Sequence, residues 1–272
     1  MSAADRLLVS EFGLVLRRRR NQLILLALVA IPIVIAVAVK LTTDSAAAST
    51  DSLIGGITNN GIFVAFTALA VVIPVFLPVA VSIVVGETIA GEAGAGTLRY
   101  LLSVPVARTR LLVTKFVAVA FWCVLIALVV AISGVVIGFA MFPVGDVTLL
   151  SGTRASLASG IGRLLVIVGY AALMMLALAA IGLFISTLTE VPIAAMAATL
   201  TVAIVMQVLV AVPQLHAIHP WLLSKHLLDF SDVLRDPLSY DGVRSGALLA
   251  LAYIAVFFSL AWSRFTTKDV SS

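Results

Sequence analysis

Charged residues are scarce in this chain of 272 residues: Asp, Glu, Lys and Arg make up 11% of it, whereas hydrophobic residues make up 62%. A water-soluble domain has about a quarter charged and about half apolar residues. A soluble core cannot bury this much apolar surface, so the composition excludes a water-soluble domain. Because the strands of a transmembrane barrel alternate apolar with polar residues, the composition also favours helical spans. We therefore predict an all-α integral membrane protein.

Cysteine is nearly absent as well, since Cys123 is the only one and lies in an apolar run. A single cysteine excludes a disulfide framework and a thiolate metal site. The formal net charge of +4 raises nucleic acid as a possible partner. The cations stand beside the apolar runs, however, which is the pattern of membrane topology. We expect membrane lipid as a partner and no nucleic acid.

The three histidines, His216, His219 and His226, fall in one polar segment beside Asp229 and Asp232. Their HxxH spacing is compatible with a metal site on a helix, but the HExxH pattern of zinc enzymes is missing. Isolated histidines near a membrane interface are more often amphipathic fillers. We expect no metal site and no cofactor in this chain.

Groups for catalysis or ion coupling are missing from the interior of the apolar runs, where the polar residues are Gln207 and scattered serines and threonines. An ionisable side chain at bilayer depth is costly and marks function, so this scarcity disfavours an intramembrane enzyme and an ion-coupled transporter. The chain also has no G-x-S-x-G pattern and no G-x-x-x-x-G-K-[ST] phosphate loop. We predict that it is not an enzyme, and that any uphill transport draws its energy from a partner.

Six apolar runs are long enough to cross a bilayer as helices, and we assign them to one transmembrane domain, residues 1–272. The first run is too long for the apolar part of a signal peptide and more spans follow it, so we interpret it as a retained span. The runs cover residues 22–39, 62–85, 111–142, 164–187, 193–212 and 245–262.

Two of these spans contain helix-modifying residues. Pro74 and Pro78 predict a kink or local unwinding in the second span. Gly134 and Gly138 form a GxxxG pair in the third span. Such a pair permits close helix approach, although it is often incidental in a membrane protein rich in glycine and alanine.

Two segments outside the spans have amphipathic patterns. Residues 5–20 predict an amphipathic helix in the inner headgroup layer, with Arg17 to Arg20 on anionic lipid. A disordered basic tail is the alternative. Residues 213–244 alternate apolar residues with charges, which indicates short interfacial helices in an outer segment.

Six spans place both termini on one side of the membrane, and the distribution of Lys and Arg selects that side. Eleven of the 17 cations lie on the side of the termini, so we predict that both termini are cytoplasmic. These eleven are Arg6, Arg17, Arg18, Arg19, Arg20, Arg99, Arg108, Arg110, Lys115, Arg264 and Lys268, and the other six are Lys40, Arg154, Arg163, Lys225, Arg235 and Arg244.

The cytoplasmic loop of residues 87–110 combines a charged start with a short apolar helix. Glu92 precedes Arg99, Arg108 and Arg110, so we expect it to pin the loop by charge pairs; a solvated carboxylate of little energetic value is the alternative. The short helix would offer an apolar face to a groove on a partner, or else lie in the lipid headgroups. Its predicted cap, apolar face and end are Thr97, Leu98, Leu101, Leu102 and Pro105.

This loop resembles the first cytoplasmic loop of type-2 ABC exporter permeases. Residues 92–98 read EAGAGTL and residues 101–108 read LLSVPVAR, which is similar to the family pattern E-x-x-x-G-T-L…L-L-S-x-P-x-x-R. Two further segments add weaker support. Residues 185–189, ISTLT, resemble the family's tight turn between the fourth and fifth spans, and residues 261–270 resemble its usual ending.

The resemblance implies six transmembrane helices with an N-terminal amphipathic helix, a cytoplasmic coupling helix and a re-entrant outer hairpin, residues 213–244, before the last span. It also implies pairing with a second copy or a similar permease, each half resting on an ABC ATPase subunit that binds ATP and magnesium. Glu190 departs from the basic or neutral residue common in relatives, which leaves ATPase contacts at the second loop open. The residues assigned to ATPase coupling are Glu92, Gly96, Thr97, Leu98, Arg99, Leu101, Leu102, Ser103, Pro105 and Arg108.

These observations predict the permease half of an ATP-driven exporter, a multi-pass protein of the plasma membrane. The spans are rich in alanine, valine and leucine, which favours an apolar or amphipathic substrate; export as the direction is implied by the resemblance alone. A non-transporting membrane scaffold or binding subunit is the alternative, and an intramembrane enzyme ranks third.

Overall fold

Six long helices form the body of the protein. The computed structural model describes residues 3–43, 60–94, 108–145, 147–148, 153–236 and 239–267. Within these ranges six helices are long and apolar enough to cross a membrane, which confirms the predicted number of spans. They are α2 (Arg19–Thr43), α4 (Ile62–Thr88), α7 (Arg108–Met141), α8 (Leu157–Leu188), α9 (Pro192–Ala211) and α11 (Asp241–Thr267).

Several of these helices are longer than the apolar runs that predicted them. Helix α8 begins at Leu157 and not at residue 164, because the Ser156 side chain caps it by accepting the Ser159 N–H at 3.3 Å. Helix α11 begins at Asp241 and α7 at Arg108, so each has a charged residue in its first turn. A hydropathy pattern registers only the apolar part of a helix, so it underestimates helices that extend into the headgroup region.

Shorter elements connect the long helices. Helix α1 (Ala3–Arg17) precedes α2, and α5 (Ala90–Gly94) follows α4. A two-residue strand pair, β1 (Val147–Thr148) and β2 (Arg154–Ala155), was not predicted. The segment before the last long helix consists of short helical turns, as expected, although its re-entry into the membrane stays a prediction. These turns are η1 (Pro213–Leu215), η2 (His219–Trp221), α10 (Leu223–His226) and η3 (Asp229–Leu234).

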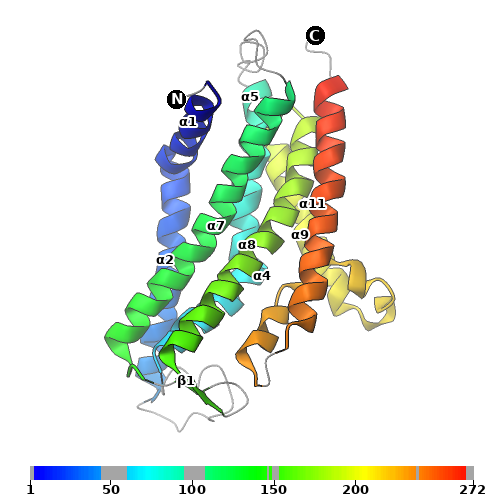
Figure 1. Ribbon diagram of the computed structural model, residues 1–272. Coiled ribbons are helices and arrows are strands. Elements are labelled where there is room, and N and C mark those ends of the chain that lie inside the picture. The colour runs from blue at the N-terminus through cyan, green and yellow to red at the C-terminus, as the bar shows by residue number, and fades with distance from the viewer. Residues whose placement is uncertain are drawn as a thin grey trace.

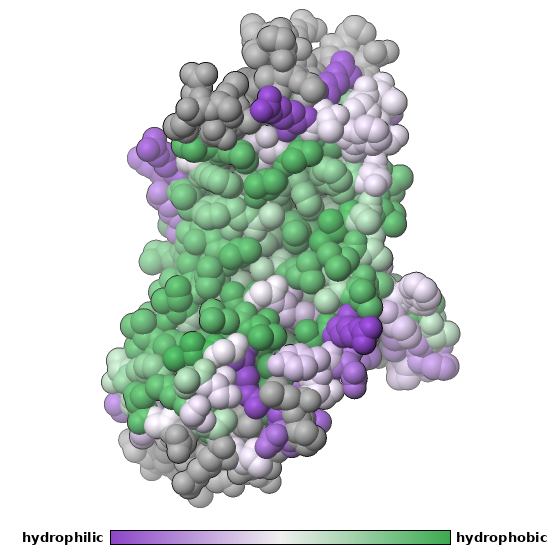
Figure 2. Space-filling model, in the orientation of Figure 1, coloured by the Kyte–Doolittle hydropathy of each residue, from purple (hydrophilic) through white to green (hydrophobic). Residues whose placement is uncertain are grey.

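Helices α4 and α8 form the centre of the bundle. Most of each is buried, whereas α2, α9 and α11 expose most of their length. Figure 1 shows the N-terminus, α5 and the end of α11 at one end of the bundle, and β1 at the opposite end. In Figure 2 a broad hydrophobic band surrounds the middle of the molecule, and polar residues gather toward its two ends. This is the arrangement that a bilayer requires of a helical protein.

The glycines of α7 form a real contact with α4. A Cβ on Gly134 would lie 2.6 Å from the Ala65 Cα, and a Cβ on Gly138 would overlap the Gly61 carbonyl. The GxxxG pair is therefore the surface on which the two backbones approach each other closely.

Helix α4 continues without interruption through Pro74 and Pro78. The local unwinding predicted as one alternative for this span is thus not found. Trp122 of α7, fully buried, donates its indole N–H to the Ala80 carbonyl at 3.2 Å just beyond the second proline.

Candidate functional site

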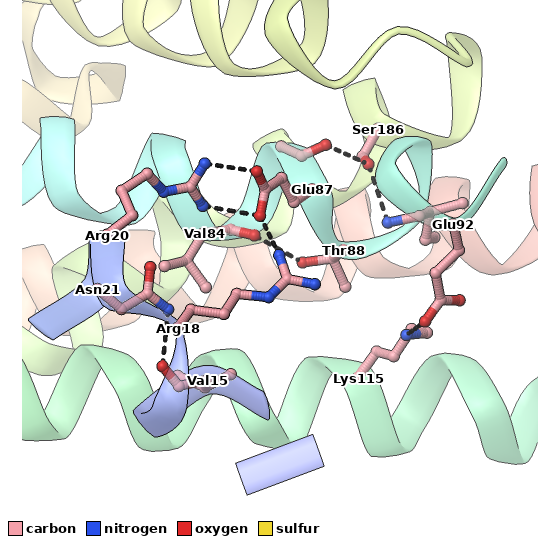
Figure 3. A network of polar contacts seen from close by, with 12 residues as sticks. Val15, Arg18, Arg20, Asn21, Val84, Glu87, Thr88, Glu92, Lys115 and Ser186 are labelled. Carbon is pink, nitrogen blue, oxygen red and sulfur yellow. Dashed lines mark hydrogen bonds and ion pairs between the residues drawn. The ribbon is translucent and has the colours of Figure 1, made fainter. Parts of the chain in front are cut away.

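The corner between α4 and α5 is held by a serine from a distant helix. Ser186 of α8 is fully buried, and its Oγ accepts the N–H groups of Ile89 at 3.2 Å and Ala90 at 2.9 Å. The same hydroxyl donates to the Gly86 carbonyl at 3.1 Å. Backbone groups at a helix end lack intrahelical partners, and Ser186 supplies both a donor and an acceptor to them. The start of the loop that follows α4 is therefore fixed on α8 (Figure 3).

Glu87, at the end of α4, receives two arginines from the junction of α1 and α2. Arg18 donates to one of its carboxylate oxygens, and Arg20 contacts both, with Nη2 to Oε2 at 2.7 Å. A guanidinium that engages both oxygens of a carboxylate has good geometry for a strong pair. We expected all four arginines of this run to bind lipid. Arg18 and Arg20 instead face Glu87, as Figure 3 shows.

Glu92 of α5 shares one lysine with a carboxylate of α1. The Nζ of Lys115 on α7 pairs with Glu92 and lies 3.2 Å from the Glu11 Oε1. The Lys115 side chain is only 3% exposed, and a buried cation of this kind needs such partners. Burial raises the pKa of Glu92 above its ordinary value of 4.5, an effect that outweighs the opposing influence of Lys115.

Glu92 thus pairs with Lys115, which we had not named as a partner. Of the three arginines that we named as partners, Arg99 lies outside the described residues. Arg108 donates to the Thr266 carbonyl of α11 at 3.1 Å, which ties the start of α7 to the end of the last helix. Lys115 lies within α7, where the sequence pattern did not indicate an ion pair.

The charged side chains enclose a small cavity of about 50 Å³ between α1, α4 and α7, lined by Glu11, Arg18, Arg20, Glu87 and Lys115 among others. On the other side of the corner, α5 packs against the turn between α8 and α9. A Cβ on Gly94 would lie 2.7 Å from the Glu190 carbonyl oxygen, so this close approach requires glycine.

Most residues predicted for ATPase coupling come later in the sequence than this corner. Their roles stay predictions, since the structure describes only Glu92 and Arg108 from the set. The others, outside the described residues, are Gly96, Thr97, Leu98, Arg99, Leu101, Leu102, Ser103 and Pro105.

The three histidines have separate surroundings. His226 Nδ1 lies 2.6 Å from the Asp229 carboxylate, and His219 Nε2 lies 3.1 Å from the Leu209 carbonyl, while His216 is exposed. Across the described part of the chain, no group of three or more His, Cys, Asp and Glu side chains is placed to hold a metal ion. The charged corner holds α1, α2, α4, α5 and α7 together through its ion pairs.

Six membrane-crossing helices with a charged, tightly held corner at one end define a multi-pass membrane protein. Residues 7–207 match the family described as ABC-2 family transporter protein, and the chain therefore belongs to this family. A search of curated proteins found no match. This match confirms the predicted resemblance to an ABC-2 type permease. The family is the transmembrane part of ABC transporters and is not itself catalytic.

Proposed function

We propose that this chain is the permease half of an ATP-driven exporter, and that its first loop receives the motion of an ABC ATPase subunit. The observation that carries the proposal is the corner from which the loop starts, held by ion pairs and hydrogen bonds, in a chain of the ABC-2 family. Ser186, Lys115 and Arg20 connect this corner to α8, α7 and α2 respectively. A force applied to the loop would therefore reach three spans at once.

In this proposal the coupling helix of residues 96–103 docks in a cleft of the ATPase through Leu98, Leu101 and Leu102. ATP and magnesium bind to the ATPase subunit, and closure of two such subunits moves two coupling helices. A second copy of this chain, or a similar permease, supplies the other half. The substrate path opens between the halves.

The direction, orientation and substrate class belong to the same proposal. Both termini lie in the cytoplasm, because eleven of the 17 cations are on their side. We place the protein in the plasma membrane, with lipid around its hydrophobic band. An apolar or amphipathic substrate suits spans that are rich in alanine, valine and leucine.

The test is co-expression of the chain with candidate ABC ATPase subunits, followed by purification through a tag on the permease. One ATPase should co-purify, and its ATP turnover should change when the permease is present. Replacement of Leu98, Leu101 and Leu102 by Asp should abolish this association while the variant still inserts in the membrane, because three carboxylates cannot enter an apolar groove without a large desolvation cost.

A matched control places aspartates at Ser263 and Thr267, which are exposed near the end of α11 at the same end of the bundle. This variant should retain the ATPase. If no ATPase binds, or if the leucine variant binds as well as the unmodified chain, the coupling role is wrong. An ATPase that binds without any change in turnover would favour the alternative of a non-transporting scaffold.

A further inference from the structure

Pro78 removes a backbone hydrogen bond from the middle of α4. In an α-helix the N–H of each residue donates to the carbonyl four positions earlier, and proline has no N–H. The carbonyl of Pro74 is therefore left without its helical donor. Within a membrane-spanning helix an unsatisfied carbonyl is costly, because hydrocarbon offers no replacement for the missing donor.

Gln207 of α9 supplies the missing donor. Its Nε2 donates to the Pro74 carbonyl oxygen across the interface between the two helices. An amide side chain in a span is itself costly unless it is hydrogen-bonded, so the two polar groups satisfy each other. The sequence contains no other glutamine between the start of the second span and Gln207.

Helix α9 lies at the edge of the bundle, where it packs against α4 and α8. In the most apolar stretch of α9 only 17% is buried, and Ile204, Val205 and Val208 are exposed. Behind the Gln207 contact is a cavity of about 20 Å³, roughly the space of one water molecule. Its lining includes Pro78, Gln207, Met174, Met175, Met206 and Leu227.

Methionine side chains are flexible and fill irregular spaces, so the cavity can enlarge when α9 moves away from α4. Its lining is mostly apolar; α10 contributes Leu223 and Ser224 to it, and Leu227 follows this helix. An alkyl chain has the chemistry to enter such a space, since it needs no polar partner there.

We propose that Gln207 is a latch that holds α9 against the proline segment of α4 and so closes this cavity to alkyl chains. Release of the latch separates the two helices and admits such a chain from the surrounding lipid. Gln207 acts as a positioning residue in this role, because it controls access through α9. Its importance depends on Pro78, since any other residue at position 78 would satisfy the Pro74 carbonyl from within α4.

The experiment combines Gln207→Met, which keeps the side-chain length but removes the amide, with Pro78→Ala, which restores the backbone donor. Spin labels at Val208 of α9 and Val124 of α7 report on the separation, because both are exposed and α7 packs on α4. The full chain is studied in lipid nanodiscs with Cys123 replaced by alanine, and photolabelling by an alkyl diazirine probes the cavity. No ATPase is needed, so the outcome is separate from the test of the proposed function.

Gln207→Met should shift the distance distribution to longer values and increase the labelling of peptides that contain Met174 or Met206. Pro78→Ala alone should act in the same direction, because the Pro74 carbonyl is then satisfied within α4. Since both changes act on the same hydrogen bond, the double variant should be no more open than Gln207→Met. Gln22→Met, the same chemical change at the start of α2, should alter neither readout. An unchanged distance in Gln207→Met, or a double variant that is clearly more open than either single variant, would overturn the latch. If Gln207→Met does not fold, recovery of folded protein by Pro78→Ala supports the proposal and a lack of recovery contradicts it.

Discussion

Glu92 has an ion-pair partner, yet its burial disfavours the charged form of its carboxyl group. It faces Lys115, yet its surroundings favour the protonated form because burial removes water from the carboxylate. A carboxyl whose pKa is raised in the folded state contributes stability that is fully present below its unfolded pKa. That contribution is lost as the pH rises through the folded pKa.

We predict that the melting temperature of the unmodified chain increases relative to that of Glu92→Gln as the pH is lowered toward 4.5, the ordinary pKa of the group. The glutamine variant lacks the titrating group but retains its size, so the difference between the two proteins isolates Glu92. Thermal unfolding in detergent at a series of pH values measures this difference. A difference that decreases on acidification would show that the Lys115 pair dominates over burial.

Pairs of elements are held together by two kinds of contact in this protein. Helices α4 and α7 approach through glycines, whereas α4, α5 and α8 are joined by the hydroxyl of Ser186. The first contact gains dispersion energy from close backbones, and the second satisfies backbone groups at a helix end. The first contact requires the absence of a side chain at the glycines, and the second requires a hydroxyl at position 186.

Gly138→Ala should destabilise the protein by about 1–3 kcal/mol, the typical cost of overpacking a well-packed core. The added Cβ would overlap the Gly61 carbonyl and force α4 and α7 apart. Gly169→Ala in α8 is the matched control, because a Cβ there meets nothing within 4 Å. Unfolding by denaturing detergent compares the two, and equal stabilities would contradict the described contact.

For the molecule as a whole, the two ends of the helix bundle carry different structural features. The end with the N-terminus carries the charged corner, and the end of α11 lies there too (Figure 1). The opposite end carries the strand pair of β1 and β2. If the first end is cytoplasmic, as we propose, the ATPase has the charged corner within reach.

In a chain with Cys123 replaced by alanine, single cysteines at Val144 and Ile218 should react with a membrane-impermeant maleimide on intact cells. Both positions are exposed, beyond the end of α7 and in the segment after α9 respectively. A cysteine at Thr267, the last residue of α11, should react only after the membrane is permeabilised. The reverse pattern would place the termini outside and exclude the proposed docking of a cytoplasmic ATPase.

The number of spans and their order were readable from the sequence because each span depends on a local property, the length of its apolar run. All six runs correspond to long helices, and the motif of residues 92–108 was sufficient to place the chain in its family. Helix ends were predicted less well, since α8 begins after the cap residue Ser156 and α11 begins at Asp241, in polar stretches that hydropathy does not register.

The partners of the polar residues were decided by the tertiary structure alone. Ser186 meets Ala90, Lys115 meets Glu11, and Gln207 meets Pro74 from positions far apart in the chain. Each of these contacts depends on which faces two helices turn toward each other, and an apolar run of nearly uniform hydropathy contains little information about its own rotation. The sequence by itself therefore determined that this is a six-span membrane protein of the ABC-2 family, while helix packing decided which polar groups hold the first loop and α9 in place.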